Sequence, residues 1–118
     1  MHLAIDFSTW RPAPGVGAQP RVVLAHWRFF MNCERRRFLA GMLPRHKTLR
    51  VTSAIVDADS LTRTWRTRSG RVYETPGPPA RDLALCALLA SMVCTYESID
   101  QLIDVSEAAW SDMQRAVQ

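Results

Sequence analysis

The chain has 118 residues, of which 47% are hydrophobic and 22% are charged, as is usual for one globular domain. Its most apolar run, residues 83–94, is shorter than the ~20 residues that span a bilayer, and its first residues lack the basic and apolar regions of a secretory signal. Three cysteines at irregular spacing argue against a disulfide framework, so we expect a reducing compartment and a cytoplasmic location.

Charge is divided unevenly along the chain, although the formal net charge is only +4. The first 81 residues hold 14 of the 15 Lys and Arg residues and 5 of the 11 Asp and Glu residues, which gives +9, while the last 37 residues carry −5. A split of this kind indicates two surfaces of different potential. It predicts that the two parts attract one another or that they meet different partners.

The amino-terminal part predicts an arm followed by two strands. Residues 1–20 include a Pro- and Gly-rich run that cannot hold regular structure, so we expect a flexible arm there. Residues 21–31 alternate with both faces largely apolar, which is typical of a central strand. Residues 32–35 then form a turn, and residues 36–43 return as a second strand. We expect residues 21–118 to form a single α+β domain, with a sheet over 21–76 and helices over 79–117.

The stretch from residue 49 to 79 predicts two successive hairpins. Residues 51–56 alternate as a strand, and the acidic residues in 57–60 indicate a turn. Residues 62–68 form the next strand, whose period of 2 puts Trp65 on one face and Arg66 and Arg68 on the other. Ser69-Gly70 provides a tight turn to residues 71–74, and the prolines of 76–79 end the sheet. The sequence therefore predicts an antiparallel meander of about five strands.

After residue 79 the spacing of apolar residues changes from that of strands to that of helices. Residues 83–93 are apolar nearly all round, which predicts the most buried element, lying across the sheet. A second helix is expected to begin at Ser98, because Ser98 and Gln101 match a capping box. A break near residues 104–106 is the alternative, since Asp104 and Glu107 form a capping pattern of their own. The predicted fold is thus α+β, with two carboxy-terminal helices packed on one sheet face.

Three short segments of the stretch from residue 49 to 79 are similar in sequence to segments of known proteins. The segments are Val-Thr-Ser-Ala-Ile at 51–55, Thr-Arg-Ser-Gly-Arg-Val-Tyr at 67–73 and Gly-Pro-Pro at 77–79, and Trp-Arg at 27–28 accompanies them. Together they resemble a family of small proteins from phages, plasmids and other bacterial mobile elements. The resemblance covers about residues 22–79 and implies the fold of that region, and it supplies no activity. The carboxy-terminal helices depart from the pattern.

Basic residues near a tryptophan form the strongest candidate binding site. Arginine beside an exposed aromatic ring suits phosphate contacts and base stacking, and it equally suits an acidic protein surface. The candidate residues are Arg63, Trp65, Arg66, Arg68, Arg71, Arg45, Lys47 and Arg50. Strand alternation divides these arginines between two faces, so a solvated sheet face is the alternative. The acidic face of the last helix is a second candidate interface, formed by Asp100, Asp104, Glu107 and Trp110.

No motif in the sequence indicates a catalytic, metal or cofactor site. The cysteines lack the Cys-x-x-Cys spacing of a zinc site, and we expect Cys86 and Cys94 to be small buried hydrophobes. The chain contains neither a Gly-x-Ser-x-Gly elbow nor a glycine-rich phosphate loop before a helix. We therefore predict a protein that is not an enzyme and that needs no metal and no cofactor.

Three hypotheses for function remain. The first rests on the expected compact two-layer domain, the lack of a catalytic motif, the divided charge and the resemblance. It is a protein-interaction module of a mobile genetic element that binds a host protein, with an anti-CRISPR-like inhibitor of a bacterial defence system as its concrete form. The second is nucleic-acid binding, with Trp65 stacking on bases and the arginines on phosphates. The third is a homodimer formed through the Trp110 and Met113 stripe or an edge strand. No membrane partner is expected.

Overall fold

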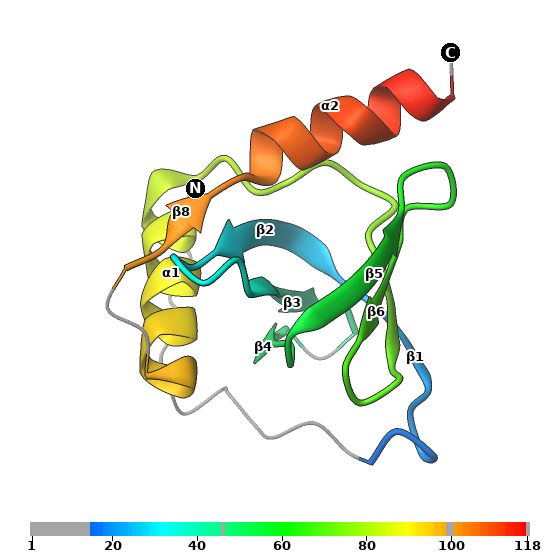
Figure 1. The fold of residues 1–118 in the computed structure, drawn as a ribbon, viewed down its shortest axis with the longest axis horizontal. Coiled ribbons are helices and arrows are strands. Elements are labelled where there is room, and N and C mark those ends of the chain that lie inside the picture. The colour runs from blue at the N-terminus through cyan, green and yellow to red at the C-terminus, as the bar shows by residue number, and fades with distance from the viewer. Residues whose placement is uncertain (1–14, 46, 99–100, 118) are drawn as a thin grey trace.

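Two four-stranded sheets lie against each other, and a helix covers the outer face of one of them (Figure 1). The computed structural model describes residues 15–45, 47–98 and 101–117. Sheet A contains, in spatial order, β1 (Arg21–Val23), β7 (Val72–Glu74), β6 (Thr64–Thr67) and β5 (Ile55–Asp59). Sheet B contains β4 (Thr48–Val51), β3 (Arg37–Leu43), β2 (Ala25–Met31) and β8 (Ile103–Asp104). The helices are α1 (Leu83–Glu97) and α2 (Ser106–Ala116).

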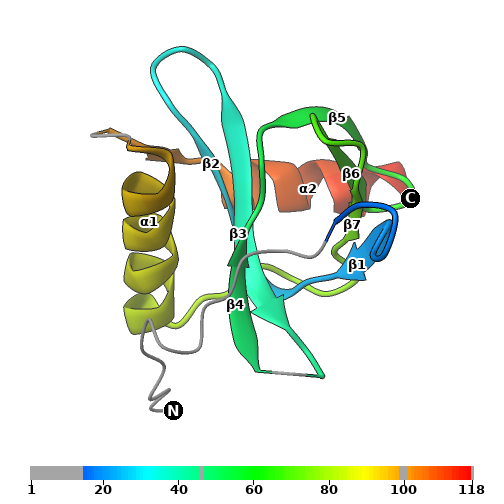
Figure 2. The same cartoon turned by 90° about the horizontal axis from the view of Figure 1, so that it is seen from below.

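The α+β class and the order of sheet followed by helices are confirmed, and the arrangement of the strands differs from the expected meander. The described residues form eight short strands in two sheets, where about five in one sheet were expected. All pairs are antiparallel except β1 and β7, which are parallel. Figure 2 shows the resulting layers in the order α1, sheet B and sheet A.

The predicted strand over residues 21–31 divides at Leu24 into β1 and β2, which belong to different sheets. A bulge lies just after the division, where His26 has a φ of 49° and the pairing with β3 shifts between Ala25 and Arg28. An extra residue bends a strand and reverses the faces of the residues that follow it. Residues on both sides of the bulge therefore reach the same core.

The predicted strand over residues 51–56 also divides, because the chain crosses from β4 in sheet B to β5 in sheet A at residues 52–54. The turn expected at 57–60 lies later, at residues 60–63. Asp57 stays in β5 and pairs with Arg66 across the strands, while the Asp59 carboxylate accepts hydrogen bonds from the backbone N–H groups of Leu61 and Thr62. The tight turn at Gly70, where φ is +95°, is confirmed.

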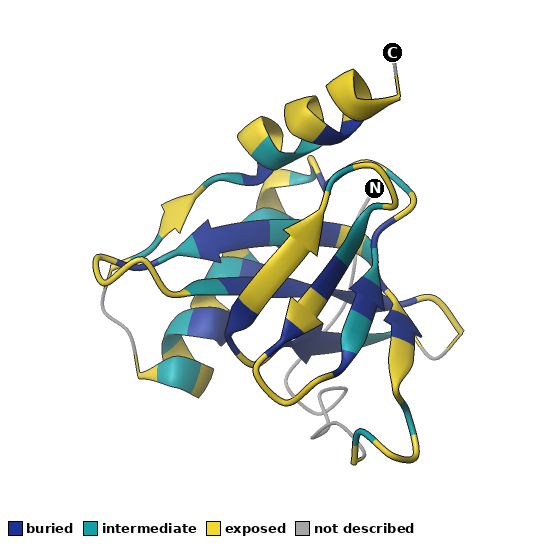
Figure 3. Ribbon diagram, turned by 45° about the vertical axis from the view of Figure 1, so that its right-hand side comes forward, coloured by how far each residue is buried: buried dark blue, intermediate teal, exposed yellow. Residues whose placement is uncertain are grey.

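Both faces of sheet B are covered, which is why β3 has no polar side chain from Phe38 to Leu43. Phe38, Ala40 and Met42 face α1, together with residues of β4. Leu39 and Leu43 face sheet A. A strand buried on two sides reads as a continuous apolar run rather than an alternation. The burial colours of Figure 3 show the contrast with β5, which is mostly exposed.

The core between the sheets is built on aromatic rings. Trp65 contacts Trp27 edge-on at a centroid distance of 5.9 Å and Phe29 at 4.5 Å. Tyr73 of β7 and Met113 of α2 complete this core. α2 packs against this core between the sheets, whereas α1 packs against a separate core on the outer face of sheet B. The expectation that the two helices share one face of a sheet is therefore wrong. Of the predicted dimer stripe, Met113 is therefore buried, at 3% exposed, and Trp110 is half-buried.

The first helix is less buried than expected. Asp82 caps it by accepting a hydrogen bond from the Leu85 backbone N–H, and four of its residues are buried against sheet B, namely Leu85, Leu89, Met92 and Val93. Leu83 and Tyr96 are exposed, so the prediction that this helix is the most buried element is wrong. A helix on the outside of a single sheet presents one stripe to it and leaves the other to solvent.

The second helix begins later than the capping box at Ser98 indicated. Ser98 has a left-handed conformation and ends α1, so the prediction of a helix start there is wrong. The alternative break near 104–106 is confirmed, because Ile103 and Asp104 form β8 beside β2 and α2 starts at Ser106. The Ser106 backbone N–H donates to the Asp104 carboxylate, but the N-cap of α2 is Val105 and makes no side-chain cap bond, so Asp104 is not the cap that the pattern with Glu107 predicted.

Candidate binding site

The tryptophan of the predicted basic-aromatic site lies in the core. Trp65 is 3% exposed, and its indole N–H donates to the Thr75 hydroxyl at 2.8 Å. The alternation placed Trp65 correctly on the face opposite Arg66, but that face is covered by sheet B. Trp65 cannot stack on a base, so its proposed role in the nucleic-acid site is wrong.

Arg63 and Trp110 are both half-buried, and they contact each other. Arg63 lies before β6 with a φ of 57°, its Nη1 donates to the carbonyl of Pro76, and its guanidinium lies 4.8 Å from the centre of the Trp110 ring. This cation–π contact joins sheet A to α2. Arg63 and Trp110 were predicted in different interfaces, and the structure brings them together as an internal contact.

Arg66 and Arg68 are exposed, as the alternation predicted. Arg66 of β6 lies 3.6 Å from the Asp57 carboxylate, and both of these side chains are more than half exposed. Arg68 follows β6, and its backbone N–H donates to the carbonyl of Ala54. Arg71 follows in the same tight turn but is buried, as is Arg50, so the predicted basic residues do not form one continuous exposed cationic site.

Two other predicted residues, Arg50 and Arg71, are buried and converge on Gln19. Each arginine is 5% exposed. Arg50 Nη1 donates to the Gln19 side-chain oxygen at 2.7 Å, and Arg71 Nε donates to the Gln19 carbonyl at 2.8 Å. Arg50 Nε has no hydrogen-bond partner in the described part of the chain. The last residues of the predicted arm are thus fixed to both sheets through Gln19, while residues 1–14 lie outside the described residues.

A groove of about 520 Å³ lies beside this junction, between β1 and the end of β3. Its volume falls within the range of about 300–1,000 Å³ that is usual for ligand pockets. Its lining residues are Gln19, Arg21, Val22, Val23, Leu43, Pro44 and Arg45. Figure 2 shows the β2–β3 turn and the β3–β4 turn at opposite ends of β3, and the groove lies at the end with the β3–β4 turn.

The rim of this groove is cationic. Arg45 and Lys47 are exposed in the β3–β4 turn, and none of the described acidic side chains forms an ion pair with either. Arg21 pairs with Glu74 at 2.6 Å. The sequence identified Arg45, Lys47 and Arg50, but it gave no signal for Gln19, whose importance depends on contacts with residues far along the chain.

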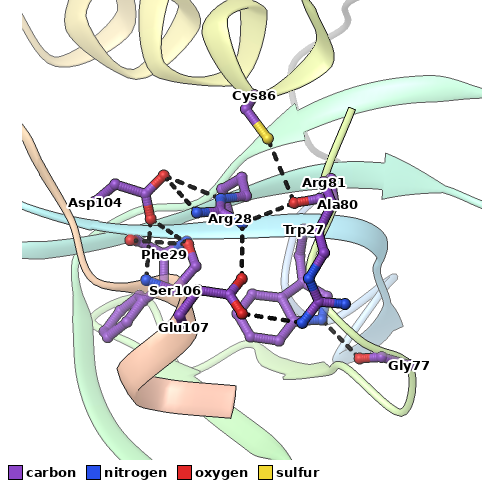
Figure 4. Close-up of polar contacts among 10 residues, drawn as sticks. All are labelled: Trp27, Arg28, Phe29, Gly77, Ala80, Arg81, Cys86, Asp104, Ser106 and Glu107. Atoms are coloured by element: carbon purple, nitrogen blue, oxygen red, sulfur yellow. Dashed lines mark hydrogen bonds and ion pairs between the residues drawn. The ribbon is translucent and has the colours of Figure 1, made fainter. Parts of the chain in front are cut away.

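The acidic residues of the second candidate interface that the structure describes, Asp104 and Glu107, are exposed but are ion-paired within the fold. Arg28 of β2 has an ion pair with Asp104 at 3.0 Å and another with Glu107 at 3.2 Å, and Arg81 pairs with Glu107 at 2.9 Å (Figure 4). Asp104 and Glu107 therefore fasten β8 and α2 to the rest of the fold. This agrees with the expectation that the basic and acidic parts attract each other. Asp100 lies outside the described residues.

The pKa values in this network follow from burial and from the opposite charges. Burial acts to raise the pKa of Asp104, but hydrogen bonds from Arg28 and Ser106 outweigh it and hold this pKa below its usual value. Burial acts to lower the pKa of Arg28, and the hydrogen bond and charge of Asp104 raise it overall. Burial raises the pKa of Cys86, whose thiol donates to the Ala80 carbonyl (Figure 4). The raised pKa favours the neutral thiol form of Cys86.

All three cysteines are free thiols, and Cys33 is exposed, whereas Cys86 and Cys94 are partly buried. No three His, Cys, Asp or Glu side chains within residues 15–45, 47–98 and 101–117 are grouped as they would be to hold a metal ion. In the same ranges, neither helix has the length and apolar character needed to cross a membrane.

Comparison of the chain with protein-family models, with curated proteins and with solved structures finds no match in any of the three.

Proposed function

We propose that this chain is a non-enzymatic protein-binding module that recognises an acidic segment of its partner at the groove beside β1. The observation that carries the proposal is the cationic rim formed by Arg45 and Lys47, which has no acidic counterpart among the described residues. Exposed charges of one sign beside a groove raise the local concentration of oppositely charged partners and steer their approach.

Other basic side chains support this choice of surface by their own pairing. Arg21, Arg28, Arg66, Arg81 and Arg115 each have a carboxylate partner within the fold. Arg50 adds a charge behind the groove, where burial reduces screening by solvent. Exposed basic side chains with no ion pair among the described residues lie in the turn of Arg45 and Lys47, in the turn of Arg35 and Arg36 and at Arg68, and the groove borders the first of these turns.

We further propose that the partner is a host protein in the bacterial cytoplasm and that the chain belongs to a mobile genetic element. The resemblance of residues 22–79 to phage and plasmid proteins supports this origin, and the free thiols support the compartment. Inhibition of a bacterial defence system, in the manner of an anti-CRISPR protein, is the concrete form of this function.

Nucleic-acid binding is the less favoured alternative. It relied on Trp65 as a stacking platform, and Trp65 is buried. The exposed arginines alone would bind phosphates with a steep dependence on salt concentration, which distinguishes this mode from the recognition of a specific protein.

Capture from a bacterial lysate with matched variants tests the proposal. The bait is the intact chain, used with and without nuclease, as wild type, as Arg45→Glu with Lys47→Glu, and as Arg35→Glu with Arg36→Glu. The two double variants change the net charge equally, and their sites are exposed at opposite ends of β3. General electrostatic attraction would respond equally to both.

The proposal predicts a stoichiometric protein that is retained after nuclease, lost from the Arg45/Lys47 variant and kept by the Arg35/Arg36 variant. Capture that disappears with nuclease supports the nucleic-acid alternative. Capture that is equally weakened in both variants contradicts the groove as the site. A captured protein whose binding survives reversal at Arg45 and Lys47 also contradicts it.

A further inference from the structure

The outer edge of β1 is open. In sheet A, β1 pairs with β7 on one side, and no described strand pairs with it on the other. An unpaired edge presents backbone donors and acceptors that can accept a further strand, and proteins usually protect such edges. The groove lies along this edge, because Arg21, Val22 and Val23 form one of its walls.

The direction of the backbone groups follows from the hydrogen bonds of the parallel pair. The Val72 N–H donates to the Pro20 carbonyl, and the Leu24 N–H donates to the Glu74 carbonyl. In a parallel ladder, alternate residues of a strand direct both backbone groups to the same neighbour. Pro20, Val22 and Leu24 therefore face β7, and the N–H and C=O groups of Arg21 and Val23 face the groove.

The side chains leave this edge accessible. Val22 is buried in the core between the sheets, while Arg21 and Val23 are exposed on the outer face of sheet A. Pro44 and Arg45 form the opposite wall, and Lys47 follows in the same turn. A segment lying along β1 would thus have free backbone groups on one side and cationic side chains on the other.

We propose that β1 takes up an extended acidic segment of the partner, which adds to sheet A as a further strand. This inference rests on the proposed function and specifies how the partner binds. Backbone hydrogen bonds to Arg21 and Val23 supply the attachment, as in other cases of strand addition. Carboxylates on the added segment reach Arg45 and Lys47 and determine which segments bind.

A second copy of this chain is the other occupant that the charges allow. β5 is the opposite edge of sheet A, and it carries Asp57 and Asp59. An acidic edge that pairs with a basic edge on the next copy gives a head-to-tail contact, which extends into a chain of molecules. Asp57 is already paired with Arg66, and the Asp59 carboxylate is bonded to its own turn, so we favour a separate partner.

Peptide binding to the intact chain tests strand addition. The probe is a short acetylated peptide of alternating Glu and Val with a fluorescent label, and its affinity is measured by anisotropy. Val23→Pro removes the outward N–H without removing a bond to β7, and proline is tolerated on edge strands. Val23→Thr keeps the N–H and is the control. A second peptide, methylated on alternate backbone nitrogens, tests the same bond with the protein unchanged.

Strand addition predicts that Val23→Pro and peptide methylation each weaken binding at least about tenfold, whereas Val23→Thr binds like the wild type. A thermal melt of Val23→Pro shows whether it is folded, and the methylated peptide decides the matter if it is not. Binding that is lost in the Arg45/Lys47 variant but is unaffected by Val23→Pro and by methylation overturns strand addition and leaves the proposed function standing.

Two further results would also overturn strand addition. One is the absence of binding to the wild type. The other is self-association by light scattering that Val23→Pro abolishes, because a second copy would then occupy the edge. Neither result removes the proposed function, which the capture of a host protein tests separately.

Discussion

Arg50 donates from its Nη1 atom to the side-chain oxygen of Gln19 at 2.7 Å, and this bond ties the segment before β1 to β4 of the other sheet. The two residues are 31 positions apart in the chain. The bond fixes β1 at the edge of sheet A and holds a guanidinium charge behind the groove. The position of the proposed binding edge therefore depends on a contact between the sheets.

Substitutions of Gln19 and Arg50 are expected to lower the free energy of unfolding by different amounts. Gln19→Ala removes an acceptor from a buried cation and should lower the free energy of unfolding by about 1–3 kcal/mol. Arg50→Met keeps much of the side-chain volume and removes a buried guanidinium whose Nε has no hydrogen-bond partner in the described structure. It should therefore lower the free energy of unfolding by less than Gln19→Ala does. Urea unfolding of both variants measures the difference. A larger loss for Arg50→Met than for Gln19→Ala would contradict the account of this junction.

The bulge in β2 requires a glycine on the neighbouring strand. A Cβ atom on Gly41 would lie 3.1 Å from the Ala25 carbonyl oxygen and 3.2 Å from the Trp27 Cα. Both atoms belong to backbone that cannot easily move, so Gly41→Ala should destabilise the fold by about 1–3 kcal/mol. Gly77→Ala is the control, because a Cβ there meets nothing within 4 Å. Thermal unfolding of the two variants checks this. Equal stabilities would contradict the prediction, because β2 and β3 would then be able to move apart at the bulge.

Asp104 makes stability depend on pH in the acid range. Its pKa is lower in the folded than in the unfolded chain, where it is about 4, so the carboxylate stabilises the fold above that pH. This contribution is lost as the pH falls through the folded-state pKa. Asp104→Asn should therefore be less stable than the wild type at neutral pH, and the difference should shrink below about pH 4. Unfolding free energies across that range test this, and a difference that grows toward acid pH would contradict it.

Local features of the fold were readable from the sequence, but the sheet to which each strand belongs was not. The period of 2 placed Trp65 opposite Arg66, and Gly70 marked its turn, because both signals depend on adjacent residues. The alternation continues through Leu24 and through residues 52–54, where the chain changes sheet. A hydrophobic period indicates which face is buried, but it does not identify the element that covers that face.

The candidate site was predictable only in part for the same reason. The turn of Arg45 and Lys47 was evident as a basic loop between strands. The arginines around Trp65 in the sequence suggest an exposed ring, but strand alternation places neighbouring residues on opposite faces, and the face of Trp65 is the buried one. The open edge of β1 arises from its pairing with β7, which lies about 50 residues further along the chain. No local pattern could indicate that contact.

Amide hydrogen exchange at β1 tests the central claim most directly. In the free chain, Leu24 should be protected by its bond to Glu74, while Arg21 and Val23 should exchange rapidly because their N–H groups face the groove. With the acidic peptide or the captured partner bound at saturation, we expect exchange at Arg21 and Val23 to slow by at least about tenfold, with little change at Leu24. Unchanged exchange at both residues in the saturated complex would contradict binding at this edge.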